Sequence, residues 1–205
     1  MTPVMDADGW NRRYEKREWP PTPREPWPVV VELTSPLQPG RALDLGAGEG
    51  RNALWLSERG WRVRTVDLSS VALDRARHLA QARGLDLEYV TADVCHYQPE
   101  AQAFELVLVT YVHPEPPGRA RLFQAAADAV APGGQLLVLG LDLAGLDAGT
   151  GGQPDPERRF TPGRLVGAFP GIELVRLERL TRDIEPGQGE GQSIDTLAWG
   201  RRPLE

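Results

Sequence analysis

The chain of 205 residues is long enough to bury one substantial core, and its 40% apolar content is that of an ordinary globular domain. A formal net charge of −6 argues against binding nucleic acid through a broad basic face, and the single cysteine, Cys95, excludes an intrachain disulfide and a cysteine metal cluster. No apolar run approaches the ~20 residues of a membrane span, and the first residues carry no apolar signal core. We therefore expect a cytoplasmic protein, a monomer or homodimer, with no membrane or nucleic-acid partner.

Residues 1–40 are polar and rich in proline, and we expect them to form an N-terminal segment attached to a main domain at residues 41–205. Trp10 and Tyr14 lie four positions apart, which predicts a short helix with an aromatic edge. The prolines within residues 20–28 then predict an extended, irregular path.

A glycine turn follows the first predicted strand, residues 42–45. Its glycines stand at alternate positions, Gly46, Gly48 and Gly50, and an apolar helical face comes next. Glycine adopts positive φ and lets a ligand approach the bare backbone, so strand, turn and helix together predict a site for a nucleotide-like cofactor. The dinucleotide fingerprint requires a further glycine where Arg51 stands, so the spacing does not fit that class.

The rest of the chain predicts alternating strands and helices. Strands are expected at residues 61–66, 85–92, 103–110, 135–139, 172–180 and 194–199. Helices are expected between Ser69 and Gly84, over residues 117–130 and over residues 161–169, with a turn at residues 132–134. This order predicts an α/β fold: a doubly wound, Rossmann-like sheet of seven strands, mostly parallel, with an antiparallel C-terminal edge strand.

Two segments are expected to be irregular. Residues 142–160 are rich in glycine and proline and show no periodicity, which is typical of a lid or a disordered loop. Residues 187–191 are expected to form a flexible hairpin loop.

Acidic residues follow successive predicted strands at Asp44, Asp67 and Asp93. Ligands of open α/β sheets bind outside the carboxyl ends of the strands, so we expect these carboxylates at one site. Other roles stay open for two of them: Asp67 also neighbours a helix N-cap, and aspartate is a common strand terminator, which applies to Asp93.

The phrase apolar-Asp-x-Gly-x-Gly-x-Gly at residues 43–50 resembles motif I of the class I S-adenosylmethionine (SAM)-dependent methyltransferases. SAM has no phosphate, which suits the negative charge of Glu49 in the turn. The resemblance implies that Asp44 receives the SAM amino group, that Asp67 holds the ribose and that Asp93 meets the adenine. The cofactor-binding residues that we predict are Arg13, Tyr14, Trp19, Asp44, Gly46, Ala47, Gly48, Gly50, Asn52, Asp67, Leu68, Asp93, Val94 and Thr110.

The N-terminal aromatic residues add to this resemblance. Trp10-x-x-Arg13-Tyr14, Trp19 and the glycine phrase resemble the small methyltransferases related to tellurite-resistance and thiopurine methyltransferases. In that group an N-terminal segment covers the cofactor, which implies that Tyr14 and Trp19 close over the methionyl end and that Arg13 meets its carboxylate. The alternative is that these aromatic rings only pack the segment onto the sheet.

The segment after the fourth predicted strand holds the candidates on the acceptor side. His113 is the candidate general base, and Tyr111 is a candidate group for orienting the acceptor. The alternative that we favour for His113 is a loop histidine that packs on, or caps, the following helix, because no second catalytic group is paired with it in the sequence. The segment Pro114–Pro117 lacks the Asn/Asp-Pro-Pro-Tyr/Phe signature of enzymes that methylate adenine in DNA or amide nitrogen.

Taken together, these features predict a SAM-dependent methyltransferase that acts on a small molecule and needs no metal. One alternative is a SAM-binding sensor or scaffold without catalysis, because the acceptor side shows no compelling catalytic residue. A less favoured alternative is a nicotinamide-dependent oxidoreductase, which shares the fold topology.

Overall fold

A computed structural model describes residues 5–19, 21, 24–146, 152–184 and 191–204. The strands are β1 (Arg41–Leu45), β2 (Arg62–Asp67), β3 (Glu88–Thr91), β4 (Phe104–Thr110), β5 (Val130–Leu141), β6 (Glu173–Asp183) and β7 (Gln192–Arg201). The helices are α1 (Ala7–Glu15), α2 (Pro28–Thr34), α3 (Arg51–Ser57), α4 (Ser70–Ala82), α5 (Pro116–Ala129) and α6 (Pro162–Leu165), with 3₁₀ turns η1 (Leu143–Gly145) and η2 (Pro156–Arg158). Within the described residues, no helix is long and apolar enough to cross a bilayer.

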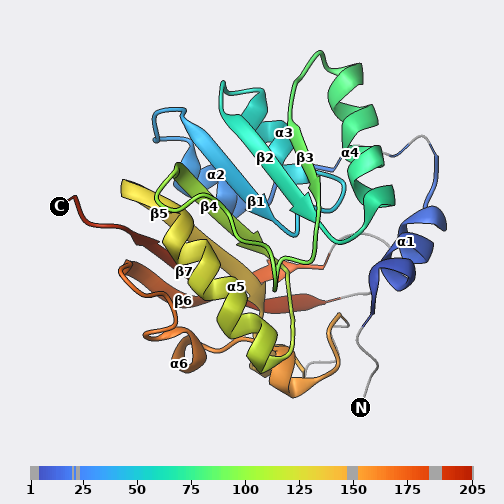
Figure 1. Ribbon diagram of the computed structural model, residues 1–205. Helices are drawn as coiled ribbons and strands as arrows, with labels where there is room; N and C mark the ends of the chain where they lie inside the picture. The colour runs from blue at the N-terminus through green and yellow to red at the C-terminus, as the bar shows by residue number, and fades with distance from the viewer. Residues whose placement is uncertain (1–4, 20, 22–23, 147–151, 185–190, 205) are drawn as a thin grey trace.

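The strands form one seven-stranded sheet in the order β3-β2-β1-β4-β5-β7-β6 (Figure 1). Strands β1 to β5 pair in parallel, and β7 runs antiparallel to both β5 and β6. This confirms the predicted α/β fold class and adds that β7 lies between β5 and β6. The strand order reverses between β1 and β4, so the carboxyl ends of these two strands mark the switch point where such sheets bind ligands.

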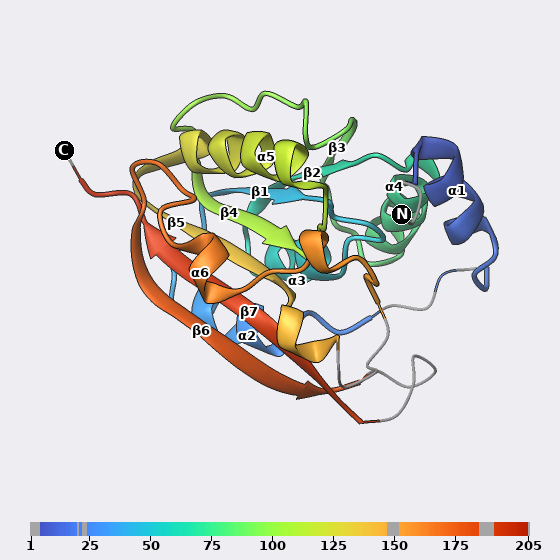
Figure 2. The ribbon, with the colours of Figure 1, turned by 90° about the horizontal axis from the view of Figure 1, so that it is seen from below.

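Helices cover both faces of the sheet (Figure 2). Apolar residues of α5 and α6 pack on one face, whereas those of α2, α3 and α4 pack on the other. The central strands β1 and β4 are buried almost throughout, as continuous apolar runs between two helical layers must be. The site at their carboxyl ends therefore lies on two buried central strands.

Residues 142–160 were expected to form a lid or a disordered loop. The part of this segment that the structure describes, residues 142–146 and 152–160, differs from that expectation. Phe160 is fully buried between His113 and Phe123, with ring centroids 4.8 and 5.7 Å away. The Arg159 side chain is also buried, and it donates a hydrogen bond of 3.1 Å to the carbonyl of Asp142. The end of the segment therefore belongs to the core, and the sequence did not show this because one aromatic residue among prolines and charges has no periodicity.

Three local predictions also differ from the structure. The predicted turn at residues 132–134 lies inside β5, which begins at Val130 and shifts register against β4. The helix predicted for residues 161–169 ends at Leu165. The predicted hairpin loop at residues 187–191 lies almost wholly outside the described residues.

Gly140 offers a test of how closely this core is packed. A Cβ at Gly140 would stand 2.6 Å from Cε2 of Phe160 and 2.8 Å from Cε1 of His113. We expect Gly140→Ala to lower the free energy of unfolding by about 1–3 kcal/mol, because two packed rings must shift. The control is Gly163→Ala, where the nearest atom lies 3.9 Å away. Urea denaturation compares the two variants, and equal stabilities would contradict this packing.

Candidate functional site

The loop after β1 is built from glycines in the left-handed region. Gly46, Gly48 and Gly50 have φ of 79°, 56° and 77°, where side chains are strained. A Cβ at Gly46 would stand 2.2 Å from Cγ2 of Val112, and one at Gly48 would stand 2.8 Å from the hydroxyl of Tyr14. Only glycine fits these three positions, because their φ values and the closeness of Val112 and Tyr14 leave no room for a side chain.

Asp67, at the end of β2, holds the glycine loop in place. Its Oδ2 accepts a hydrogen bond from the backbone N–H of Gly48 at 2.8 Å, and its Oδ1 accepts one from Ser69 at 2.8 Å. Burial raises the pKa of Asp67 and these backbone donors lower it, with a net rise. The structure thus gives Asp67 an anchoring role beside the helix N-cap Ser69. The predicted ribose contact remains a prediction.

Asp44, at the carboxyl end of β1, is a buried carboxylate without a partner. It is 1% exposed, and neither carboxylate oxygen accepts a hydrogen bond from the described residues. Burial, with a smaller contribution from the charge of Asp67, raises the pKa of Asp44 to about 7. Such a group is costly unless a cation or donor reaches it. The glycine loop and this carboxylate therefore fit a ligand with an ammonium group, as SAM has.

Asn52 and Thr110 connect the glycine loop to the acceptor side. Asn52 donates from Nδ2 to Oγ1 of Thr110 at 3.1 Å and accepts a hydrogen bond from the backbone N–H of Trp27 at 3.2 Å. Asn52 and Thr110 are both buried. These contacts join the start of α3, the end of β4 and the residue before α2.

The N-terminal segment is fastened to α4 beside the site (Figure 1). The hydroxyl of Ser69 donates to Oδ1 of Asn11 at 2.7 Å. Arg75, which is 3% exposed, donates to the carbonyls of Arg17 at 3.0 Å and Glu18 at 2.9 Å. A buried arginine that binds two carbonyls of one segment fixes that segment's path.

Glu49, the acid within the glycine turn, forms ion pairs with two arginines. Arg17 pairs with it directly, and Nη1 of Arg75 lies 3.4 Å from its Oε1. The turn's negative charge therefore binds the N-terminal segment to the glycine loop.

The three N-terminal residues that we predicted to contact the cofactor lie in different places. Tyr14 lies over Gly48, and burial, with the nearby charge of Asp67, raises the pKa of its phenol. Trp19 is 60% exposed, with its ring centroid 5.0 Å from that of His78 on α4. Arg13 lies over the ring of Trp10, 5.4 Å from the centroid. Of the three, Tyr14 is the residue that the structure brings to the glycine loop.

Asp93 lies in the turn after β3 and caps it. Its Oδ1 accepts from the backbone N–H of Cys95 at 2.9 Å, and its Oδ2 lies 2.8 Å from Nδ1 of His96. Val94 is buried in the core beside α5, whereas Leu68 and Ala47 are partly exposed next to the loop. Asp93 thus has a structural role as a turn cap, and its predicted contact with adenine remains a prediction.

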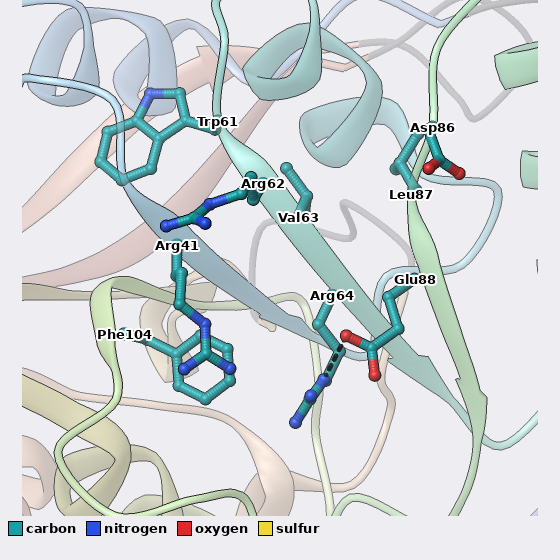
Figure 3. Close-up of a pocket in the computed structure, with 9 residues that line it drawn as sticks. All are labelled: Arg41, Trp61, Arg62, Val63, Arg64, Asp86, Leu87, Glu88 and Phe104. Atoms are coloured by element: carbon teal, nitrogen blue, oxygen red, sulfur yellow. Dashed lines mark ion pairs between the residues drawn. The ribbon is translucent and has the colours of Figure 1, made fainter.

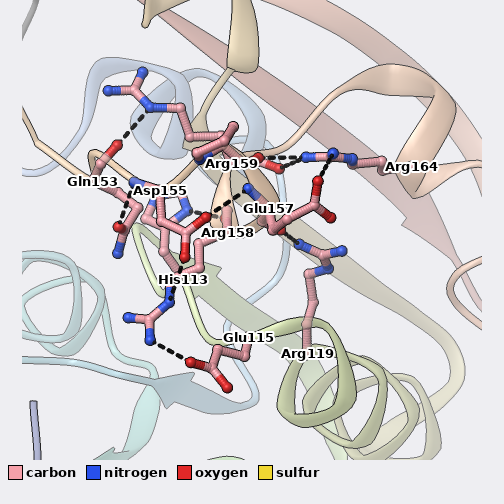
Figure 4. A network of polar contacts seen from close by, with 10 residues as sticks. His113, Glu115, Arg119, Gln153, Asp155, Glu157, Arg158, Arg159 and Arg164 are labelled. Atoms are coloured by element: carbon pink, nitrogen blue, oxygen red, sulfur yellow. Dashed lines mark hydrogen bonds and ion pairs between the residues drawn. The ribbon is translucent and has the colours of Figure 1, made fainter. Parts of the chain in front are cut away.

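His113 is held at both ring nitrogens in a polar network (Figure 4). Its Nδ1 lies 3.1 Å from the carbonyl of Arg158, to which it donates, and its Nε2 accepts from the backbone N–H of Leu141 at 3.2 Å. Burial, with the charges of Arg159 and Arg119, lowers its pKa to about 4. His113 therefore has a packing role, but its partners are Arg158, Leu141 and Phe160 rather than the following helix, and no lone pair remains to take a proton from an acceptor.

Tyr111 belongs to a cluster that the sequence did not reveal. Its φ is 56°, and its hydroxyl donates to Oδ2 of Asp195 at 2.6 Å. Nε of Arg182 donates to the same hydroxyl at 2.8 Å and to Asp195 at 2.6 Å. Asp195 lies 84 positions away in the chain and Arg182 lies 71, so no local motif could have joined them.

A cavity of about 600 Å³ lies at the opposite edge of the sheet (Figure 3). It is lined by the first residues of three strands, namely Arg41 of β1, Arg62 of β2 and Glu88 of β3. Arg64 in its wall pairs with Glu88 at 2.8 Å. These strand starts lie far from the switch point, so the cavity is not part of the candidate site. Within the described part of the chain, no group of three or more metal-ligating side chains occurs.

A left-handed glycine loop and a buried acid without a hydrogen-bond partner among the described residues thus lie at the switch point of a Rossmann-like sheet, and the N-terminal segment is fastened to α4 beside them. Residues 42–134 match the family model described as a methyltransferase domain. This match covers a little under half of the chain and agrees with the resemblance to the class I SAM-dependent methyltransferases.

Three known proteins illustrate the similarity. Demethylmenaquinone methyltransferase of Thermus thermophilus is 33% identical over 112 residues, 54% of this chain and 51% of that protein, so the chain spans about half its length. A structure solved for the conversion of a disulfide bond into a thioacetal group during echinomycin biosynthesis has a TM-score of 0.76 at 22% identity, covering 97% of this chain and 93% of that one. TehB from Haemophilus influenzae has a TM-score of 0.71 at 17% identity, covering 96% and 66%. These structural similarities show a shared fold.

The charged form of Asp44 is expected to destabilise the ligand-free protein and to favour binding of SAM. Folding raises the pKa of Asp44 from 3.8 to about 7, so the protonated carboxyl is favoured in the folded state. Its contribution to the free energy of unfolding is therefore fully present below pH 3.8 and is lost as the pH rises through about 7. At pH 8 we expect Asp44→Asn to raise the melting temperature of the ligand-free protein and to weaken SAM binding. Asp74→Asn, at an exposed acid, is the control. Calorimetry measures both quantities, and a lower melting temperature with unchanged binding would refute the assignment.

The neutral state of His113 is directly measurable. We expect long-range ¹H–¹⁵N NMR to show the Nδ1-protonated tautomer at pH 6, with a titration midpoint near 4. Because this pKa lies below the ordinary 6.5, the stability contributed by neutral His113 is present above pH 6.5 and is lost as the pH falls toward 4. A midpoint above 6 would show that the ring is accessible and restore it as a candidate base.

Proposed function

We propose that this protein transfers a methyl group from SAM to a small-molecule acceptor. The observation that carries the proposal is the buried carboxylate of Asp44, unpartnered beneath a left-handed glycine loop. The Thermus relative is named for a small quinone-type acceptor, demethylmenaquinone, which supports an acceptor of that size class. The net charge of −6 also favours a small molecule over a nucleic acid.

Within this proposal, the site residues bind and orient the cofactor. Asp44 receives the amino group, Asp67 holds both the loop and the ribose, and Asp93 faces the adenine. The bare backbone at Gly46 and Gly48 admits close approach of the ligand. Bound SAM supplies a methyl group on a positively charged sulfur, which is already activated for displacement.

The chain's own contribution to the reaction is alignment and exclusion of water. The N-terminal segment, residues 1–40, covers the cofactor as part of one unit with residues 41–205, through Arg75 and the ion pairs of Glu49. His113 is not assigned as a base, because both of its ring nitrogens are hydrogen-bonded. An acceptor that attacks without losing a proton needs no base.

The alternatives from the sequence gain no support. The family model and the Thermus relative are described as methyltransferases, so neither a nicotinamide enzyme nor a non-catalytic sensor is favoured.

Isothermal titration with SAM and S-adenosylhomocysteine tests the proposal. We expect both to bind the wild type, and Asp67→Ala to weaken binding by roughly tenfold or more, because it removes charge-assisted hydrogen bonds from the loop. His113→Ala, checked for folding by circular dichroism, is expected to bind almost as the wild type does. Absence of binding by the wild type would refute the proposal, and equal losses in the two variants would contradict the assigned roles.

A further inference from the structure

The Arg182 guanidinium lies at the carboxyl edge of the sheet, where the methyl acceptor is expected. The hairpin of β6 and β7 places it there: Arg182 pairs with Ser193, and Asp195 pairs with Leu141 at the end of β5. Tyr111, which contacts Arg182, follows the last residue of β4. The next residue, Val112, packs against Gly46 of the cofactor loop. The Arg182 cluster and the glycine loop are therefore neighbours.

One edge of this guanidinium is fixed by hydrogen bonds. Nε of Arg182 donates to Oδ2 of Asp195 at 2.6 Å and to the hydroxyl of Tyr111 at 2.8 Å. Asp195 is 1% exposed, and its Oδ1 accepts from the hydroxyl of Ser193 at 3.2 Å. Asp195 thus has donors from Tyr111, Arg182 and Ser193, which disperse its charge and hold the arginine in one orientation.

The other edge of the guanidinium is available to a ligand. Nη1 of Arg182 makes a long bond of 3.3 Å to the carbonyl of Asp183, and Nη2 has no hydrogen-bond partner among the described residues. The Arg182 side chain as a whole is 23% exposed. The Asp183 carboxylate accepts a hydrogen bond from Nε2 of Gln192 at 3.3 Å, and Arg182 forms its ion pair with Asp195.

Aromatic rings flank the same group. The guanidinium carbon of Arg182 lies 4.9 Å from the ring centroid of Trp27 and 5.2 Å from that of Tyr111. The two rings are 4.4 Å apart at 41°. Tyr111 holds its ring there at a φ of 56°, a strained conformation that persists where the surrounding structure enforces it. A ligand group bound to Arg182 would have these rings beside it, and Arg51 also lies over the Trp27 ring, 3.8 Å from its centroid.

We propose that Arg182 binds an oxyanion of the methyl acceptor, with Asp195 and Tyr111 as positioning residues that aim its free edge. This inference rests on the proposed function and deepens it: the acceptor is a carboxylate-type anion on a planar ring. Arginine suits this task because its planar fork binds two oxygens at once. An anionic acceptor also balances the positive charge of the methyl donor beside it.

Benzoate and benzamide are matched probes for this site, because they differ in the anionic group alone. Each is titrated by calorimetry into wild-type protein loaded with S-adenosylhomocysteine. We expect benzoate to bind more tightly than benzamide by roughly tenfold or more, because the neutral amide cannot form the two charge-assisted hydrogen bonds that a carboxylate forms with arginine. Arg182→Gln is expected to abolish this preference, and Arg182→Lys to keep only part of it. A wild type without preference for benzoate overturns the inference.

Arg176→Gln is the matched control, because Arg176 lies on the same strand and pairs with Glu32 at 2.6 Å and Glu178 at 2.7 Å instead. It should keep the preference for benzoate. If Arg182→Gln does not fold, Arg182→Lys decides the matter, and an unchanged preference in that variant overturns the inference. Titration of S-adenosylhomocysteine itself tests the proposed function separately, and benzoate titrated into the ligand-free protein reports on Arg182 even if the cofactor product does not bind.

Discussion

The buried, unpartnered carboxylate of Asp44 is the constraint on which the rest of this structure depends. It stands at the end of β1, where the strand order reverses, and no described residue donates to it. The fold tolerates the cost of that burial because the neighbouring loop is stabilised separately, by Asp67 at the end of β2. One acid thus secures the loop while the other is left for a ligand, and burial keeps the pKa of both above the ordinary value.

The N-terminal segment is coupled to this loop by charge. Glu49 lies in the glycine turn and pairs with Arg17 of the segment and with Arg75 of α4. Arg75 also binds two carbonyls of the segment, so one buried guanidinium connects α4, the turn and the N-terminal segment. The segment is thus ordered in advance, and if it covers the cofactor as we propose, binding does not have to pay the entropic cost of ordering it.

The acceptor side is divided between two clusters on opposite faces of the sheet. His113 and Phe160 pack with α5 on one face, and Tyr111 and Trp27 pack with α2 and α3 on the other. The first cluster is closed, because His113 is bound at both nitrogens and is kept neutral by burial. In the second, Arg182 donates to Tyr111 and Asp195, and this residue, which carries no motif, is the one that we propose for recognition of the acceptor.

The sequence by itself determined the fold class, the glycine loop and the acids at the strand ends. These features follow from local rules: strand and helix periodicities, the φ freedom of glycine at Gly46 and Gly48, and the carboxyl-edge rule for α/β sheets. Only the tertiary structure decided that Trp19 lies on His78, that Phe160 enters the core, and that Tyr111 joins Arg182 and Asp195. The physical reason is that strand order and register bring together residues that lie far apart in the chain. The β6–β7 hairpin places β7 beside β5, and the periodicity of the sequence does not indicate which side chains this order brings into contact.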